Sequence, residues 1–204
     1  MSIDSNRVIF VQVLDMERYN GIYDEKGNQI DDYASGGGSY TDDKKYEQFN
    51  FRPMDGQYYG YTPPYAKINL DKLNKDNIQR DSKGRRFIND VTVVFTTTGG
   101  SYQTGRYICG FYAHARVYEK PISIKNAQRY IHKYDQYASF NVIAKVENSL
   151  LLPRHLRTYQ IENGKKVIGG FGQSNMWYAD QNDEYRETIL KYINELYAFV
   201  KSKQ

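Results

Sequence analysis

Residues 106–119 read RYICGFYAHARVYE, and this stretch carries a long and informative alternation of side chains. The odd positions from Tyr107 to Val117 are mostly apolar, whereas the even positions from Ile108 to Tyr118 include glycine, histidine and arginine. A period of two indicates a β-strand that presents alternate side chains to opposite faces of a sheet. We expect the odd face to pack on the core and the even face to line a groove or carry another layer.

Further strands are predicted on both sides of this one along the chain. Apolar or alternating runs lie at 7–14 (RVIFVQVL), 90–98 (DVTVVFTTT), 141–147 (NVIAKVE) and 150–153 (LLLP). The sequence PMDG at 53–56 separates residues 49–51 from residues 58–61, which predicts a strand, a tight turn and a second strand.

Two loops and two helices complete the expected elements. Residues 17–46 are polar and rich in glycine, which predicts a loop, and residues 67–89 predict a basic surface excursion with a short helical turn. Apolar residues at helical spacing predict helices over 123–135 and 183–201. The residues at this spacing are Ile124, Ala127, Ile131 and Tyr134 in the first, and Tyr185, Ile189, Tyr192, Leu196 and Phe199 in the second.

Together these elements predict one α+β domain over residues 1–204. Strands and helices do not alternate regularly, which argues against a doubly wound parallel sheet. We therefore expect a twisted, partly closed mixed β-barrel of five to seven strands with two to three flanking helices, the last of which is the amphipathic helix 183–201.

Composition narrows the classes of protein that remain. The chain has 204 residues, one cysteine (Cys109) and a net charge of +4. A disulfide within the chain is therefore impossible, and no apolar run approaches the roughly 18 residues that span a bilayer. The N-terminal residues have no basic region followed by an apolar stretch, so a signal peptide is not expected. The single cysteine favours a reducing compartment, so we expect a cytoplasmic protein with no membrane partner. A net positive charge permits a nucleic-acid partner without requiring one.

Tyrosine is unusually abundant, with 21 residues. Tyrosine offers a flat ring and a polar tip, so an excess suggests binding surfaces or an aromatic pocket. It also favours strands, so a sheet-rich fold explains the same number. The sequence leaves both interpretations open.

Catalytic motifs are not apparent in the sequence. His114, His132 and His155 are not spaced as metal ligands, and Gly36-Gly37-Gly38-Ser39 lacks the lysine of a phosphate-binding loop. His114 is expected to be a structural histidine and Cys109 an inert core thiol. We therefore expect no metal, no cofactor and no catalytic residues, although a nuclease or base-excising enzyme with a diffuse site stays an alternative.

Residues 169–178 (GGFGQSNMWY) combine the features of a recognition site. Glycines let a ligand approach the main chain, amide side chains read base edges, and the single Trp177 offers a stacking surface. Basic residues between 154 and 166 lie directly upstream, where they would meet phosphates. The alternative is that Trp177 anchors the core and the glycines form a loop.

Three segments resemble the domain at the front of many bacterial HNH-type, modification-dependent restriction endonucleases. They are Gly36 to Tyr40 with residues 47–61 (EQFNFRPMDGQYYGY), residues 90–118, and LLLP at 150–153 with GFGQSNMWY at 170–178. The middle segment is also similar to the strand pair of EVE and YTH domains. The resemblance implies a PUA-like or EVE-like barrel that holds a flipped, modified base in an aromatic cage.

Candidate site residues follow from this resemblance and from the basic segments. The expected base pocket consists of Trp177, Tyr178, Gln173, Ser174, Asn175, Gly172, Tyr112, Tyr40 and Tyr59. The expected phosphate contacts are Arg154, Arg157, Lys165, Lys166, Arg85 and Arg86.

The function expected from this resemblance is that of a reader of methylated or hydroxymethylated cytosine in duplex DNA, within a restriction or defence system. Nuclease activity is expected to lie in another domain or in a partner chain. A protein-interaction accessory domain, in which the tyrosines form a protein interface, is the remaining alternative.

Overall fold

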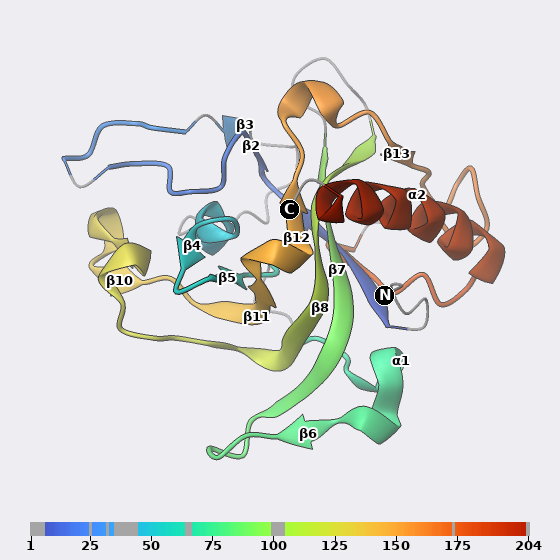
Figure 1. Cartoon of the computed structure of the whole chain (residues 1–204), viewed down its shortest axis with the longest axis horizontal. Coiled ribbons are helices and arrows are strands. Elements are labelled where there is room, and N and C mark those ends of the chain that lie inside the picture. Colours follow the sequence, from blue (N-terminus) through green and yellow to red (C-terminus); the bar gives the residue numbers. More distant parts are fainter. Residues whose placement is uncertain are drawn as a thin grey trace.

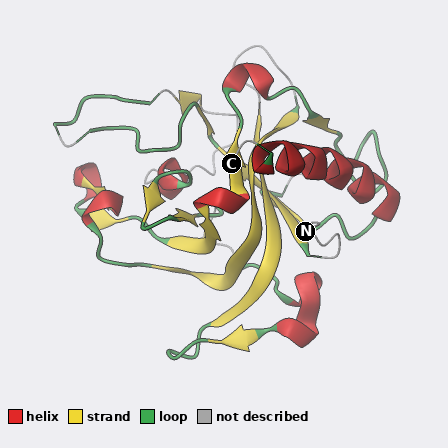
Figure 2. Ribbon diagram, viewed as in Figure 1, coloured by secondary structure: helices red, strands yellow, loops and turns green. Residues whose placement is uncertain are grey.

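The structure, a computed structural model, describes residues 7–24, 26–31, 33–34, 45–63, 67–98, 105–172 and 174–202. Within these residues a ten-stranded mixed sheet dominates, and helix α2 (Asp183–Lys201) lies along one side of its central strands (Figure 1). Loops and short helical turns gather on the other side (Figure 2). The expected combination of a mixed sheet with helices in one chain is confirmed.

The sheet is built around two long antiparallel strands, β7 (Arg86–Thr98) and β8 (Arg106–Ile122). Strand β1 (Val8–Val13) runs parallel to β7, and β14 (Met176–Trp177) pairs antiparallel with β1. The other edge of β8 pairs in turn with β13 (Gln160–Ile161), β12 (Ser149–Leu151) and β11 (Phe140–Lys145).

Short elements extend this frame. The remaining strands are β2 (Asp15–Met16), β3 (Tyr33–Ala34), β4 (Pro53–Met54), β5 (Gln57–Gly60), β6 (Gln79–Arg80), β9 (Tyr130–Ile131) and β10 (Gln136–Tyr137). The short helices are α1 (Asp71–Asn74), η1 (Tyr46–Phe49), η2 (Lys75–Asn77), η3 (Ala127–Arg129), η4 (His132–Tyr134), η5 (Val146–Asn148) and η6 (Arg154–Leu156).

The main sheet order is β14-β1-β7-β8-β11-β5-β4, and no pairing among the described strands joins β14 to β4. The sheet of described strands is therefore not a closed barrel.

The two faces of the sheet carry separate hydrophobic cores. Along β1, Ile9 and Val11 belong to one core and Val8 and Phe10 to the other, as a period of two requires. Helix α2 covers the core of Phe10. The opposite core is covered by residues from the loop after β1 and from the segment around α1, which include Met16, Tyr19, Ile22, Ile68, Leu70 and Leu73.

Strand β8 does not keep the alternation expected from its sequence. Cys109, Tyr112 and Ala115 share one core although they are three residues apart, and Phe111 and Ala113 face the other core with Ile108. The register between β7 and β8 explains this change of face. One step along β7, from Phe95 to Thr96, corresponds to two residues of β8, from Gly110 to Ile108. Two steps along β7, from Val91 to Val93, correspond to three residues of β8, from Ala115 to Tyr112. Each step inserts one extra residue in β8, and each such bulge moves the following side chains to the opposite face.

The helix expected over 123–135 is wrong. The segment forms two single turns, η3 and η4, with the short strand β9 between them. The Asn126 side chain accepts a hydrogen bond from the Gln128 amide and begins η3, and Asp135 ends η4 with a φ of 49°. Two separate single turns thus give the same spacing of apolar residues as one α-helix would, although the continuous hydrogen bonds of an α-helix are absent between them.

The strand expected at residues 49–51 is also wrong, whereas the following turn is confirmed. Residues 46–49 form η1, and the Asn50 side chain donates to the Tyr61 carbonyl at 3.1 Å and accepts from the Tyr61 amide at 2.8 Å. The Asn50 side chain therefore forms the two hydrogen bonds with the Tyr61 main chain that a neighbouring strand would otherwise form. Asp55 and Gly56, both with positive φ, form the turn between β4 and β5.

Helix α2 has the predicted bounds, but its buried face is rotated from the expected stripe. Ile189, Leu190, Ile193 and Tyr197 are buried, and Phe199 is 61% exposed. Positions four and eight residues apart still lie on one face, so the helix remains amphipathic. None of the described helices is long and apolar enough to cross a membrane.

Candidate binding pocket

Trp177 is part of the core beneath α2. Its ring is 8% exposed, lies 4.7 Å from the Phe10 ring and stacks on Phe171 at 5.5 Å between centroids. The indole Nε1 donates to the Gly169 carbonyl at 3.1 Å, and Gly169 has a φ of 76°. These contacts match the alternative in which Trp177 anchors the core and the glycines shape a loop.

The residues expected to form the base pocket are dispersed. Tyr112 lies in the core on the face of the sheet opposite to Trp177. Tyr59 packs on Phe140 at 5.1 Å, and the Tyr178 hydroxyl accepts a hydrogen bond from the Asn69 amide at 2.8 Å. The structure therefore does not bring these side chains together in one cavity.

The remaining expected pocket residues belong to the turn before β14 or lie outside the described residues. The Ser174 hydroxyl accepts a hydrogen bond from the Met176 amide, and the Asn175 carbonyl accepts one from the Gln12 amide. Gly172 has open space where a Cβ would lie. Tyr40 and Gln173 lie outside the described residues.

Arg157, an expected phosphate contact, is instead buried in an ion pair. Its side chain is 4% exposed, its Nη1 lies 2.7 Å from the Asp15 carboxylate, and it donates to the carbonyls of Leu152, Met16 and Glu17. A guanidinium so enclosed has no route to a phosphate of DNA. Arg154 pairs with the same Asp15 at 3.2 Å and is 34% exposed.

The other expected phosphate contacts lie at the surface. Arg85 pairs with Asp81, Arg86 with Glu119 and Asp71, and Lys166 with Glu162. Lys165 is exposed and forms no ion pair with a described residue. Five of the six expected cations are therefore paired with carboxylates of the protein itself.

A cavity of about 610 Å³ lies elsewhere, between the 20–30 loop, η1 and the 127–132 segment. Its aromatic lining comes from Tyr23, Phe49, Tyr130 and the imidazole of His132, and Arg52 adds a guanidinium. The volume falls within the usual range for small-molecule sites, which runs from roughly 300 to 1,000 Å³. This cavity is the candidate functional site of the described chain.

The 20–30 loop is held in place by side chains that bond to its main chain. The Asp31 carboxylate accepts the amides of Glu17, Arg18 and Tyr19 at 2.9–3.1 Å. The Gln48 side chain accepts the Ile22 amide at 3.0 Å, and the Gln48 carbonyl accepts the Gly21 amide at 2.8 Å. The loop is thus fastened to η1, which fixes one wall of the cavity.

The tip of this loop is a tight turn organised by Asp24. The carboxylate accepts hydrogen bonds from the Asn28 side chain and from the amides of Lys26 and Asn28. These bonds, the Asn28 side chain foremost, lower the pKa of Asp24. Asp24 lines the cavity as a carboxylate whose oxygens are engaged within its own turn.

The opposite wall is formed by aromatic side chains from the 127–132 segment. The Tyr130 ring meets the His132 ring edge to face at 4.8 Å and lies 5.2 Å from the Tyr137 ring. The Tyr130 hydroxyl donates to the Asp135 carboxylate, and this hydrogen bond raises the pKa of Tyr130. The wall therefore presents fixed ring faces and edges, which suit a flat ligand.

Two guanidinium groups flank the buried Phe49 ring. Arg52, which lines the cavity, lies 5.8 Å from the ring centroid, and Arg129 lies 5.5 Å from it. Arg129 is fully buried, and burial lowers its pKa to about 10, with the nearby charge of Arg52 contributing further. Sequence reasoning assigned neither arginine to a site.

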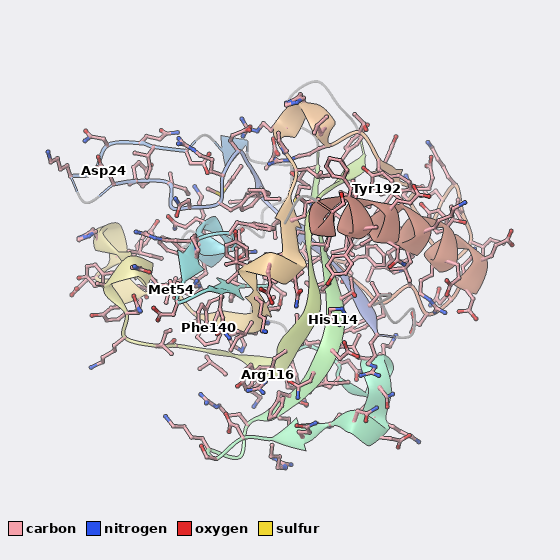
Figure 3. The ribbon with its side chains drawn as sticks, viewed as in Figure 1. Asp24, Met54, His114, Arg116, Phe140 and Tyr192 are labelled. Atoms are coloured by element: carbon pink, nitrogen blue, oxygen red, sulfur yellow. The ribbon has the colours of Figure 1, made fainter. Side chains whose placement is uncertain are left out.

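His114 and Asp90 form a second cluster, distant from the cavity. Figure 3 shows His114 beside α2 and Asp24 at the tip of the loop on the other side of the molecule. The His114 Nε2 atom is buried and has no hydrogen-bond partner among the described residues. A catalytic base must reach its substrate, and a buried Nε2 atom does not, so we assign a structural role to this pair.

The described residues contain no group of three or more histidine, cysteine, aspartate or glutamate side chains that would hold a metal ion. The Cys109 thiol is buried, and burial raises its pKa to about 11, which keeps it protonated and unreactive.

Comparisons of the chain with protein-family models, with curated proteins and with solved structures found no match.

Proposed function

We propose that this chain is a nucleic-acid-binding module that recognises a modified base, a methylated or hydroxymethylated cytosine turned out of duplex DNA. The base enters the cavity between the 20–30 loop, η1 and the 127–132 segment. The observation that carries the proposal is the lining of this cavity, in which Tyr23, Phe49 and Tyr130 surround a space of about 610 Å³.

Aromatic walls suit a base because every base has a flat face that stacks on them. Stacking on an aromatic side chain contributes about 1–3 kcal/mol per base, which offsets the cost of removing the base from the duplex. Tyr23 is 47% exposed, so a face of this residue is available without rearrangement of the core. Asn20 lies on the same lining and supplies an amide that can read a base edge.

The charge of the protein supports a DNA partner. The net charge is +4, and the exposed Lys165 and Lys166 remain the phosphate contacts that we propose among the residues expected from the sequence. Arg157 and Trp177 leave the proposed site because both are buried. The relationship to PUA-like and EVE-like readers, with nuclease activity in another domain or partner chain, is part of the proposal.

The proposal is tested by fluorescence anisotropy with three labelled duplexes that differ only in one cytosine, which is unmodified, 5-methylated or 5-hydroxymethylated. We expect a modified duplex to bind more tightly, and Tyr23→Ala to remove this preference. Tyr192→Ala is the matched control, because Tyr192 is a partly buried tyrosine on α2, far from the Asp24 loop (Figure 3). Equal affinity of the unaltered protein for all three duplexes contradicts the proposal.

A further inference from the structure

The wall of the cavity at Phe49 is electropositive. The Arg129 guanidinium donates to the carbonyls of Tyr59 at 2.7 Å, Ser139 at 2.9 Å and Ala138 at 3.2 Å. These bonds satisfy its donors, but carbonyl oxygens do not neutralise a charge. Within the part of the chain that the structure describes, Arg129 forms no ion pair, so its positive charge behind the Phe49 ring has no carboxylate partner there.

Arg52 brings a second positive charge to the same ring from the side of the cavity. It lies 5.8 Å from the Phe49 centroid and lines the cavity, whereas Arg129 does not. The two cations act on each other, since the charge of Arg52 contributes to the lowered pKa of Arg129. Low-dielectric walls concentrate such a field in the cavity, where it attracts anions.

Among the described residues of the lining, Asp24 carries the negative charge, and the position of its carboxylate limits its effect on the cavity. Its oxygens accept three hydrogen bonds from Lys26 and Asn28 at the far tip of the loop. They are therefore directed to the turn, and Asp24 forms no ion pair with a described residue. An anion that enters beside Arg52 would lower the repulsion between the two guanidinium groups.

From this arrangement we infer that the cavity takes a nucleotide rather than a bare ring, with the phosphate beside Arg52 and the ring against the aromatic walls. The inference rests on the proposed function for the ring and adds an anion site to it. Guanidinium groups bind phosphate through paired, charge-assisted hydrogen bonds, which single out Arg52 as the contact. Arg129, which is enclosed, strengthens the site through its charge and touches no ligand.

Calorimetric titration with matched monomers tests the inference. The probes are 5-methyldeoxycytidine, its 5′-monophosphate and inorganic phosphate, and the duplexes above form a second arm, in which the phosphate belongs to the DNA backbone. We expect the monophosphate, or the modified duplex, to bind at least about tenfold more weakly to Arg52→Gln than to the unaltered protein. Arg52→Lys should keep part of the affinity, since it keeps the charge.

Lys191→Gln is the matched control, because it removes one exposed charge on α2, outside the cavity and away from the proposed phosphate contacts. Circular dichroism of each variant verifies the fold. Affinities that Arg52→Gln leaves within about twofold in both arms overturn the inference, as does equal binding of nucleoside and monophosphate. Phosphate binding that depends on Arg52, without any binding of nucleoside or preference among duplexes, upholds the anion site and overturns the proposed function instead.

Discussion

His114 and Asp90 face each other across β8 and β7 with their side chains joined by a hydrogen bond of 2.6 Å between Nδ1 and Oδ1, and both have a positive φ, 53° and 62°. Each residue occupies a bulge, one in each strand. Non-glycine residues adopt this conformation at a cost, so the hydrogen bond stabilises two strained positions together. The Tyr197 ring meets the imidazole edge to face, with 6.0 Å between the ring centroids.

Asp90→Ala should lower the free energy of unfolding by roughly 1–3 kcal/mol, because it removes this bond and places a less tolerant side chain at positive φ. Asp90→Gly loses the same bond but relieves the backbone, so it should cost less. Urea unfolding of both variants measures the difference. The account of strain is wrong if glycine destabilises the protein as much as alanine does.

Trp177→Ala should destabilise the fold by about 3–5 kcal/mol, since it removes a large side chain from between Phe10 and Phe171. Trp177→Phe should cost less, because it refills part of the space. Thermal unfolding measures the loss of stability, and duplex binding is measured well below the transition. A folded Trp177→Phe variant that has lost discrimination between duplexes would return this residue to the base pocket.

Gly110→Ala should destabilise the protein by about 1–3 kcal/mol through overpacking. An added Cβ would lie 2.6 Å from the Leu150 carbonyl oxygen and 2.8 Å from Cζ of Phe51. Gly172→Ala is the control, because nothing lies within 4 Å of its Cβ position. Equal urea midpoints for the two variants would show that the close packing of β8 on β12 is not rigid.

Alkaline pH should unfold the protein through its buried tyrosines. Burial raises the pKa of Tyr19 and Tyr112 well above the usual 10.0. A group whose pKa is higher in the folded state contributes stability that is complete below the pKa of the unfolded state and is lost as the pH rises beyond it. The free energy of unfolding should therefore begin to fall near pH 10.

Arg129 acts in the opposite direction, because burial lowers its pKa from 12.5 to about 10. Between these two pH values the unfolded chain holds the proton and the folded chain has lost it, so the free energy of unfolding gains a contribution as the pH rises. Two tyrosines outweigh one arginine, and the net change is a loss. Urea unfolding at increasing pH measures it, and Tyr112→Phe should make the fall shallower, whereas Tyr23→Phe at an exposed site should not. A stability that does not decline above pH 10 contradicts the prediction.

The long strands and α2 could be predicted from the sequence because their side chains follow a simple period. The regions 7–14, 90–98 and 141–147 correspond to β1, β7 and β11, and 183–201 corresponds to α2. The faces of β8 could not be predicted, because a bulge changes the phase without leaving a signal in composition. His114 and Asp90 show this directly, since neither is a glycine.

The candidate site was harder to predict than the fold. Tyr23, Phe49 and Tyr130 come from three distant segments, and each has an ordinary local context. Arg129 lies off the apolar spacing of residues 124–134 and has polar neighbours such as Lys125 and Gln128, so nothing in the sequence singles it out. Interpretation of the segment as a helix placed that arginine at the surface.

The pairing of β1 with β7 and β14 also dictates when the chain can finish folding during synthesis. Phe10 is opposite Val94 on one side and Trp177 on the other, so the first strand waits for partners made much later. Contacts between such distant residues form slowly, and unpaired strand edges attract other chains in the meantime. On the ribosome, the apolar stretch VIFVQV therefore has no β14 partner until residue 177 has emerged, and this edge of β1 stays open to other chains until then.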